Sequence, residues 1–138
     1  MTGDNGPIGY GGWMVADPTN GGVLWMVVDD GAYKITNART GTWTATKITA
    51  APNASCVGVA PNGDVYITCV PTSTGQFAAL YRSTDHGATW TDIADDNYRN
   101  SAILARSVAA RNDGTVLVAT NGCGVLVYDE PVMKAQMS

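Results

Sequence analysis

The sequence predicts an all-β protein assembled from repeated antiparallel hairpins. Its 138 residues include 16 glycines and are rich in Thr, Asn, Asp and Val, a composition typical of strands and tight turns. Short apolar runs are separated by Pro, Asn or Asp followed by Gly, which is the pattern of hairpin turns. The same order of run, turn and run returns along the chain, so we expect one architecture throughout.

The first hairpin of each unit is marked by a turn between two apolar runs. These hairpins cover residues 15–25, 59–67 and 109–118, and their turns contain Asn-Gly or Asp-Gly. A further strand follows in each unit, at 31–36, 79–84 and 124–128. Each of these turns needs backbone conformations that Gly, Asn and Asp adopt readily. Because three such turns occur, we expect three hairpin units.

A fourth strand is predicted in two of the units by a Thr-Trp-Thr sequence. Trp43 and Trp90 stand 47 residues apart, and no third copy follows in the last unit, which we therefore expect to have three strands. A repeat of about 45–50 residues with four strands per unit is typical of β-propeller blades. Ser101–Ser107 contains good helix formers and is expected to be a short helical turn between units.

The chain is expected to form a single β-propeller-type domain over residues 1–138. Its blades are predicted at about 8–50, 54–96 and, incomplete, 102–130. A propeller closes with about four to eight blades, so we expect closure by association, in a homo-oligomer or a larger assembly. Ile8–Tyr10 is a candidate for a strand exchanged with a partner. A small open β-sandwich is the alternative fold.

One turn carries a specific motif. Ser83, Asp85, Gly87 and Trp90 fit the pattern S-x-D-x-G-x-x-W. Short Ser and Asp side chains can bond the backbone of their own turn, and glycine accepts a positive φ. The tryptophan is expected to return into the sheet and bury its ring. The stretch 36–43 is a decayed copy, because it keeps the tryptophan but lacks the aspartate.

This motif resembles the Asp box (BNR repeat) of xyloglucanase-type and sialidase-type β-propellers. Asp boxes also occur in sortilin-like receptors and in phage and surface proteins. The resemblance covers most of residues 12–130 and implies the propeller fold. It implies no particular activity, because Asp boxes lie at the periphery of blades and serve structure there.

The resemblance does not extend to a catalytic constellation. Sialidases use an arginine triad and a Tyr/Glu pair, and neither the arginines nor Glu130 stand in that context. Xyloglucanase-type enzymes use two aspartates, but Asp29-Asp30-Gly31 has the composition of a tight turn. The one histidine, His86, lies in the Asp-box turn and is expected to be exposed. We therefore assign no catalytic residue, metal site or cofactor.

Four residues are candidates for ligand contact. Tyr10 and Tyr98 have polar or glycine neighbours and are expected to be exposed aromatic side chains, whereas Trp13 and Trp25 alternate with apolar residues and are expected in the core. Asp95 and Asp96 belong to an acidic stretch that is expected to be a solvated loop. Binding of Ca²⁺ there is the alternative.

Two cysteines flank the turn at residues 61–63. A two-residue turn would place Cys56 opposite Cys69 and allow a disulfide. Pro61 lacks the N–H that such a turn uses, which favours a three-residue turn with Gly63 in a bulge. The two sulfurs then point to opposite faces of the sheet, and buried free thiols are expected.

Charge and composition argue against two classes of partner, nucleic acid and membranes. Eight basic residues against twelve acidic ones give a net charge of −4, which argues against nucleic acid as a ligand. No run is long and apolar enough to cross a membrane, and the glycine-rich first ten residues do not resemble a signal peptide. We expect a non-enzymatic interaction or scaffold module of an extracellular or virion surface, which binds glycans. A fragment of a secreted glycoside hydrolase and a purely structural subunit are the alternatives.

Overall fold

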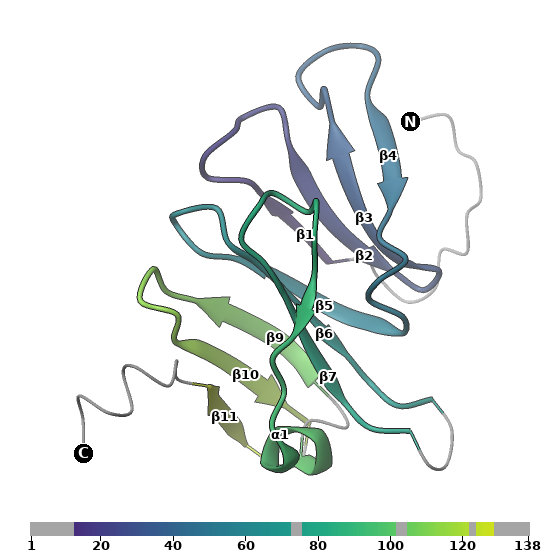
Figure 1. Ribbon diagram of the computed structural model, residues 1–138. Coiled ribbons are helices and arrows are strands. Elements are labelled where there is room, and N and C mark those ends of the chain that lie inside the picture. Colours follow the sequence, from purple (N-terminus) through teal and green to yellow (C-terminus); the bar gives the residue numbers. More distant parts are fainter. Residues whose placement is uncertain (1–12, 73–75, 102–104, 122–123, 129–138) are drawn as a thin grey trace.

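The computed structural model describes residues 13–72, 76–101, 105–121 and 124–128 (Figure 1). The described part is built from strands and one short helix, α1 (Asp96–Ser101). The strands are β1 (Trp13–Ala16), β2 (Leu24–Val28), β3 (Gly31–Thr36), β4 (Thr44–Lys47), β5 (Ala54–Val59), β6 (Val65–Cys69), β7 (Ala79–Ser83), β8 (Thr91–Asp92), β9 (Ala105–Ala110), β10 (Val116–Thr120) and β11 (Val125–Tyr128). The expected all-β class is confirmed.

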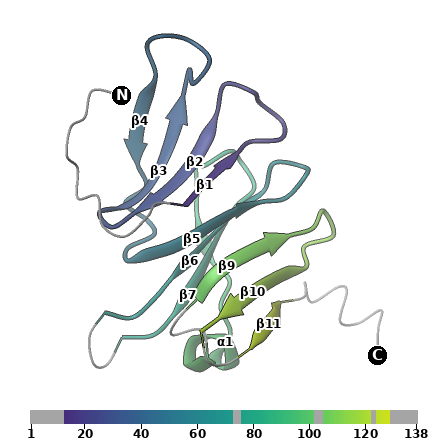
Figure 2. The ribbon, with the colours of Figure 1, turned by 180° about the vertical axis from the view of Figure 1, so that it is seen from behind.

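The strands form three antiparallel sheets, and each sheet takes consecutive strands. The orders are β1-β2-β3-β4, β5-β6-β7-β8 and β9-β10-β11. Figures 1 and 2 show these sheets following one another along the molecule, with the middle sheet between the other two. The stack is open, because the first and third sheets each have the middle sheet on one side only.

Apolar side chains fill the two layers between the sheets. One core cluster joins the first sheet to the middle sheet and contains Trp25, Val57 and Ile67. The other joins the middle sheet to the third and contains Tyr66, Leu80 and Val118. Every residue of β6 is buried, as expected for a strand covered on both faces, whereas burial alternates along β2.

The inner strands of neighbouring sheets approach closely at one glycine. A Cβ at Gly58 in β5 would lie 2.7 Å from the carbonyl oxygen of Val108 in β9. That distance leaves no room for a methyl group unless the backbone of β9 moves. Gly58 therefore allows the third sheet to pack against the middle one.

The first turn of the middle sheet has the predicted three-residue form. Ala60 N donates to Asp64 O at 2.8 Å, Gly63 N donates to Ala60 O at 2.8 Å, and Gly63 has a φ of +95°. Because of this turn Cys56 lies opposite Thr68 rather than opposite Cys69. The two cysteines are buried free thiols in different core clusters, as expected. Burial raises their pKa values to about 11 for Cys56 and about 12 for Cys69.

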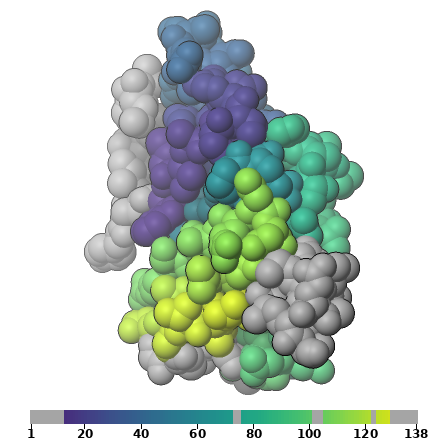
Figure 3. Space-filling model, turned by 90° about the vertical axis from the view of Figure 1, so that its left-hand side faces the viewer, coloured from purple at the N-terminus to yellow at the C-terminus, as the bar shows by residue number. Residues whose placement is uncertain are grey.

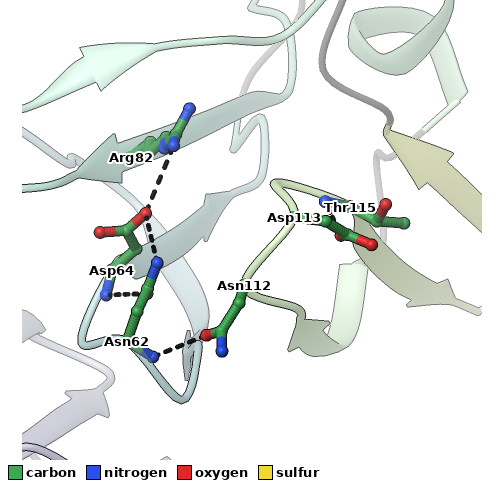
Figure 4. A network of polar contacts seen from close by, with 6 residues as sticks. All are labelled: Asn62, Asp64, Arg82, Asn112, Asp113 and Thr115. Atoms are coloured by element: carbon green, nitrogen blue, oxygen red, sulfur yellow. Dashed lines mark hydrogen bonds and ion pairs between the residues drawn. The ribbon is translucent and has the colours of Figure 1, made fainter. Parts of the chain in front are cut away.

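Polar contacts join the turns of the middle and third sheets (Figure 4). Asn62 N donates to Asn112 Oδ1 at 2.7 Å, which ties the β5–β6 turn to the β9–β10 turn. Asn62 also accepts a hydrogen bond from the backbone of Asp64, whose carboxylate pairs with Arg82 at 3.3 Å. Figure 3 looks onto this side of the molecule, where the first hairpins of the three sheets follow one another. The Asn62–Asn112 contact therefore contributes to the alignment of the middle and third sheets.

Two local predictions are wrong in part. The acidic stretch is exposed as expected, but it is a loop only as far as Asp95, because Asp96 begins helix α1. The helical turn expected over Ser101–Ser107 is wrong for its last three residues, because β9 begins at Ala105; α1 ends at Ser101, and 102–104 lie outside the described residues. Asp95 caps the helix by accepting a hydrogen bond from Tyr98 N at 2.8 Å, which a loop interpretation overlooks. In the described part of the chain, no helix has the length and apolar character needed to cross a membrane.

Candidate functional site

A cavity of about 620 Å³ lies at the end of the stack where the inner strands β1, β5 and β9 begin. We call it the end cavity. It lies at the opposite end of these strands from the turns that Figure 3 faces. Its lining includes Trp13, Val28, Asp29, Ser55, Thr72 and Arg106. Its volume falls within the usual range for small-ligand sites, about 300–1,000 Å³.

Trp13 provides an exposed aromatic surface in this cavity. Its pairing with Val27 places it on the face of the first sheet that turns toward the middle sheet. Its side chain is nevertheless 42% exposed, whereas Trp25 on the same face is fully buried. The core position expected for Trp25 is confirmed and that expected for Trp13 is wrong. The difference arises because Trp13 begins its strand and lies beside the cavity.

Two β-bulges bring polar side chains to the end cavity. In β5 the register shifts between Ala54 and Cys56, so that Ser55 has no direct partner across the ladder. In β9 the shift falls between Ser107 and Ala105, which leaves Arg106 in the corresponding position. A bulge redirects a side chain away from its regular face. The same irregularity in two neighbouring sheets therefore places a hydroxyl and a guanidinium at one site.

Asp29 completes the polar lining from the turn between β2 and β3. The expected tight turn is confirmed, because Gly31 has a φ of +140° and Asp30 turns away to pair with Lys47 at 2.9 Å. Asp29 and Arg106 are both exposed. The end cavity thus combines an aromatic face, one carboxylate, one guanidinium and the Ser55 hydroxyl, which shares a 2.7 Å hydrogen bond with Thr68.

The turn between β7 and β8 is held by its own side chains. Ser83 donates to Asp85 at 2.8 Å and accepts a hydrogen bond from Gly87 N at 2.8 Å. Thr89 donates to Asp85 through its backbone at 2.8 Å and through its hydroxyl at 2.5 Å. These hydrogen bonds, first those from Thr89 and then that from Ser83, lower the pKa of Asp85 to about 2. The carboxylate therefore serves the turn and is not held ready for proton transfer.

This turn also packs against the first sheet. Trp90 meets Trp25 edge to face, with ring centroids 6.2 Å apart. Gly87 has a φ of +90°, and a Cβ there would lie 2.8 Å from the Trp25 ring. Lys34 reaches across from β3, donates to the carbonyl oxygen of His86 at 2.6 Å and lies 5.3 Å from the centre of the Trp25 ring. The His86 side chain is exposed.

The corresponding turn of the first sheet lacks these contacts. In 36–43 the turn is closed by Thr40, whose backbone and hydroxyl both donate to Asn37 O. Asn37 takes the positive φ of 57° that glycine would favour. Trp43 is 47% exposed and belongs to neither core cluster. The loss of the aspartate therefore coincides with an exposed tryptophan.

The predicted exposure of Tyr98 is wrong. Its side chain is only 4% exposed and packs in the cluster between the middle and third sheets. Burial raises its pKa, and its hydroxyl has no hydrogen-bond partner among the described residues. The first turn of α1 points this ring inward, although its sequence neighbours are polar. Tyr98 is therefore a core residue and not a ligand contact.

The other predicted contacts do not gather at the end cavity. Asp95 and Asp96 are exposed at the start of α1, where their charge favours the helix N-terminus. Asp92 accepts hydrogen bonds and pairs with Arg99 at 2.9 Å. Tyr10 and the rest of the candidate exchange strand, Ile8–Tyr10, lie outside the described residues. Among the residues that the structure describes, no three His, Cys, Asp or Glu side chains are grouped as metal ligands would be.

Sequence reasoning missed Trp13, Ser55 and Arg106 as site residues. The missing information is the pair of bulges, which change the direction of a side chain without changing the apolar pattern. One signal was available: Ser55 and Arg106 each stand five residues before the residue that opens the three-residue turn, Ala60 and Arg111. That equal spacing places them at equivalent points of two repeats.

Comparison with known proteins gives no family assignment. No protein-family model matches the chain, and no curated protein matches it significantly.

Proposed function

We propose that this chain is a non-enzymatic recognition module built from β-propeller blades, which binds glycans in the end cavity. The observation that carries the proposal is the exposed ring of Trp13 beside Asp29 and Arg106 in a cavity of ligand size. The apolar face of a sugar ring stacks on an aromatic side chain, and its hydroxyls pair with carboxylate, guanidinium and hydroxyl groups.

The blade interpretation is supported by the repeated sheets and by the β7–β8 turn. Three meanders of the same strand order follow one another and pack face to face. The hydrogen bonds among Ser83, Asp85 and Thr89 and the positive φ of Gly87 are those that the Asp-box motif requires. A propeller needs about four to eight blades, so the chain functions in association with further blades.

A recognition role fits the end cavity better than hydrolysis. Glycoside hydrolysis uses two carboxyl groups about 5–10 Å apart, one of them as a proton donor. Asp29 is the one carboxylate among the described residues that line the end cavity. The proposed setting is an extracellular or virion surface, where a low-charge, turn-rich module would meet glycans.

A glycan array followed by calorimetry on the strongest glycan tests the proposal. We expect the unmodified chain to bind and Trp13→Ala to lose binding with little change in Tm. Trp43→Ala is the matched control, because Trp43 is exposed to a similar degree but lies outside the end cavity. Arg106→Ala should weaken binding without abolishing it.

Three results would count against this function. Absence of binding across the array favours a purely structural subunit. Equal losses for Trp13→Ala and Trp43→Ala place the ligand elsewhere. Release of reducing sugar from xyloglucan or β-glucans, abolished by Asp29→Asn, would instead identify a hydrolase.

A further inference from the structure

The three sheets repeat one interface, and equivalent residues can be identified in each. The second strand of every sheet has five residues, and its second position holds Trp25, Tyr66 or Leu117. Trp25 belongs to the core cluster shared with the middle sheet, and Tyr66 to the cluster shared with the third. We call the face that holds these residues the forward face, since it turns toward the next sheet along the chain.

The cross-strand partners of these residues follow the same rule. Trp25 lies opposite Lys34 and Tyr66 opposite Arg82, and each cation stands over the ring of its partner, at 5.3 Å and 5.8 Å. In the third sheet, Leu117 lies opposite Val127. The position that holds a cation over a ring in two sheets thus holds an apolar pair in the last one.

The backward face of each sheet is equally regular. In the middle sheet it presents Val65 and Ile67 to the forward face of the first sheet. In the third sheet it presents Val116 and Val118 to the forward face of the middle sheet. The equivalent positions in the first sheet, by their place in the strand, are Leu24 and Met26.

Each end of the stack therefore carries half of an interface. On the forward face of the third sheet, Leu117, Val125 and Val127 are 37%, 61% and 57% exposed. On the backward face of the first sheet, Met14 lies opposite Met26 and is 53% exposed. Within the described part of the chain, none of these side chains belongs to either core cluster. Apolar faces of this kind mark contact surfaces.

We propose that a second copy of this chain covers both faces. The forward face of the third sheet in one copy packs on the backward face of the first sheet in the other, and the reverse contact closes a ring of six sheets. A second copy is the expected partner because the chain already forms this kind of interface twice. Each free face is the counterpart of a face that a neighbouring sheet covers, with the apolar pair Leu117–Val127 where the covered faces have a ring and a cation. The inference rests on the proposal that the sheets are propeller blades.

The contact is heterologous, because two different faces meet, and a two-fold axis makes it occur twice. One mutation on either face therefore disrupts both contacts of a dimer formed by identical mutant chains. A mixed dimer contains one chain mutated on the forward face and one mutated on the backward face. One of its two contacts then joins two unmodified faces, and both substitutions lie in the other contact. Mutants of opposite faces should therefore associate with each other although neither associates with itself.

Light scattering after size exclusion tests this on the full chain. We expect the unmodified protein at twice the 14.4 kDa mass of one chain. Leu117→Asp and Met14→Asp should each halve the mass, and an equimolar mixture of the two should restore it. Thr46→Asp, on an exposed position of β4, is the control and should leave the mass unchanged. If Leu117→Asp lowers Tm, Val125→Asp takes its place.

Several outcomes would overturn the inference. An unmodified chain that stays at the single mass has no such contact. A shift for one of the two mutants alone indicates a contact between identical faces. A mixture that stays at the single mass excludes complementary faces. None of these results bears on glycan binding at Trp13, which is measured separately, so failure of this inference and failure of the proposed function are distinguishable.

Discussion

The middle sheet and the first sheet start from the same hairpin pattern but differ in burial. All five residues of β6 are buried, while burial alternates in β2 and every residue of β4 is exposed. The β7–β8 turn holds Trp90 against Trp25, whereas the β3–β4 turn leaves Trp43 in solvent. The comparison teaches that local pattern determines the strands, and that position in the stack determines which side chains are buried.

The largest expected effect on stability concerns helix α1, which follows the middle sheet. Tyr98→Ala should lower the free energy of unfolding by about 3–5 kcal/mol, because it leaves a cavity between two sheets. Tyr98→Phe is the matched control and should be close to neutral, since the hydroxyl has no hydrogen-bond partner among the described residues. Urea unfolding measures both. A loss of less than about 1 kcal/mol for Tyr98→Ala would contradict the burial of this ring.

The glycine of the β7–β8 turn comes next. Gly87→Ala should lower the free energy of unfolding by about 2–4 kcal/mol. The added Cβ would strain the backbone at its positive φ and would also overpack against Trp25. Gly41→Ala in the β3–β4 turn should stay within about 0.5 kcal/mol, because a Cβ there would meet nothing within 4 Å. Thermal and urea unfolding of the two variants would show the contrast. Equal costs would mean that the two turns are not packed differently.

The two turn tryptophans sharpen the same contrast. Trp90→Ala should lower the free energy of unfolding by about 2–3 kcal/mol. This is somewhat less than truncation of a fully buried ring would cost, because Trp90 is only partly buried. Trp43→Ala should lower the free energy of unfolding by less than about 0.5 kcal/mol, since the residue is 47% exposed. Denaturant midpoints with an unchanged m-value test this pair. If Trp90→Ala lowers the free energy of unfolding by less than about 1 kcal/mol, the contact of its ring with Trp25 does not stabilise the fold.

The smallest expected effect is a dependence on pH. The folded pKa of Asp85, about 2, lies below its ordinary value of 3.8, so its contribution to stability is present above pH 3.8 and is lost as the pH falls through about 2. The stability difference between the unmodified chain and Asp85→Asn should therefore shrink between pH 4 and pH 2. A difference that stays constant over this range would show that the carboxylate does not act in its charged form.

The features that could be predicted from the sequence are those that depend on local chemistry. The strands, the three-residue turn at Gly63 and the free thiols follow from turn residues and the register that they impose. Tyr98 was misplaced because polar neighbours say nothing about which side of a helical turn faces the core. Trp13 was misplaced because the apolar alternation of its strand carries no sign of where the neighbouring sheet ends. The end cavity depends on two bulges, which composition and periodicity do not reveal.

One measurement tests the relation between the two ends of the stack most directly. Hydroxyl-radical footprinting of the unmodified chain over a range of concentrations reports the exposure of individual side chains. We predict that Met14 on the first sheet and Leu117, Val125 and Val127 on the third lose reactivity together as the concentration rises, while Trp43 stays reactive. Protection of one face alone, or of neither, would contradict the account.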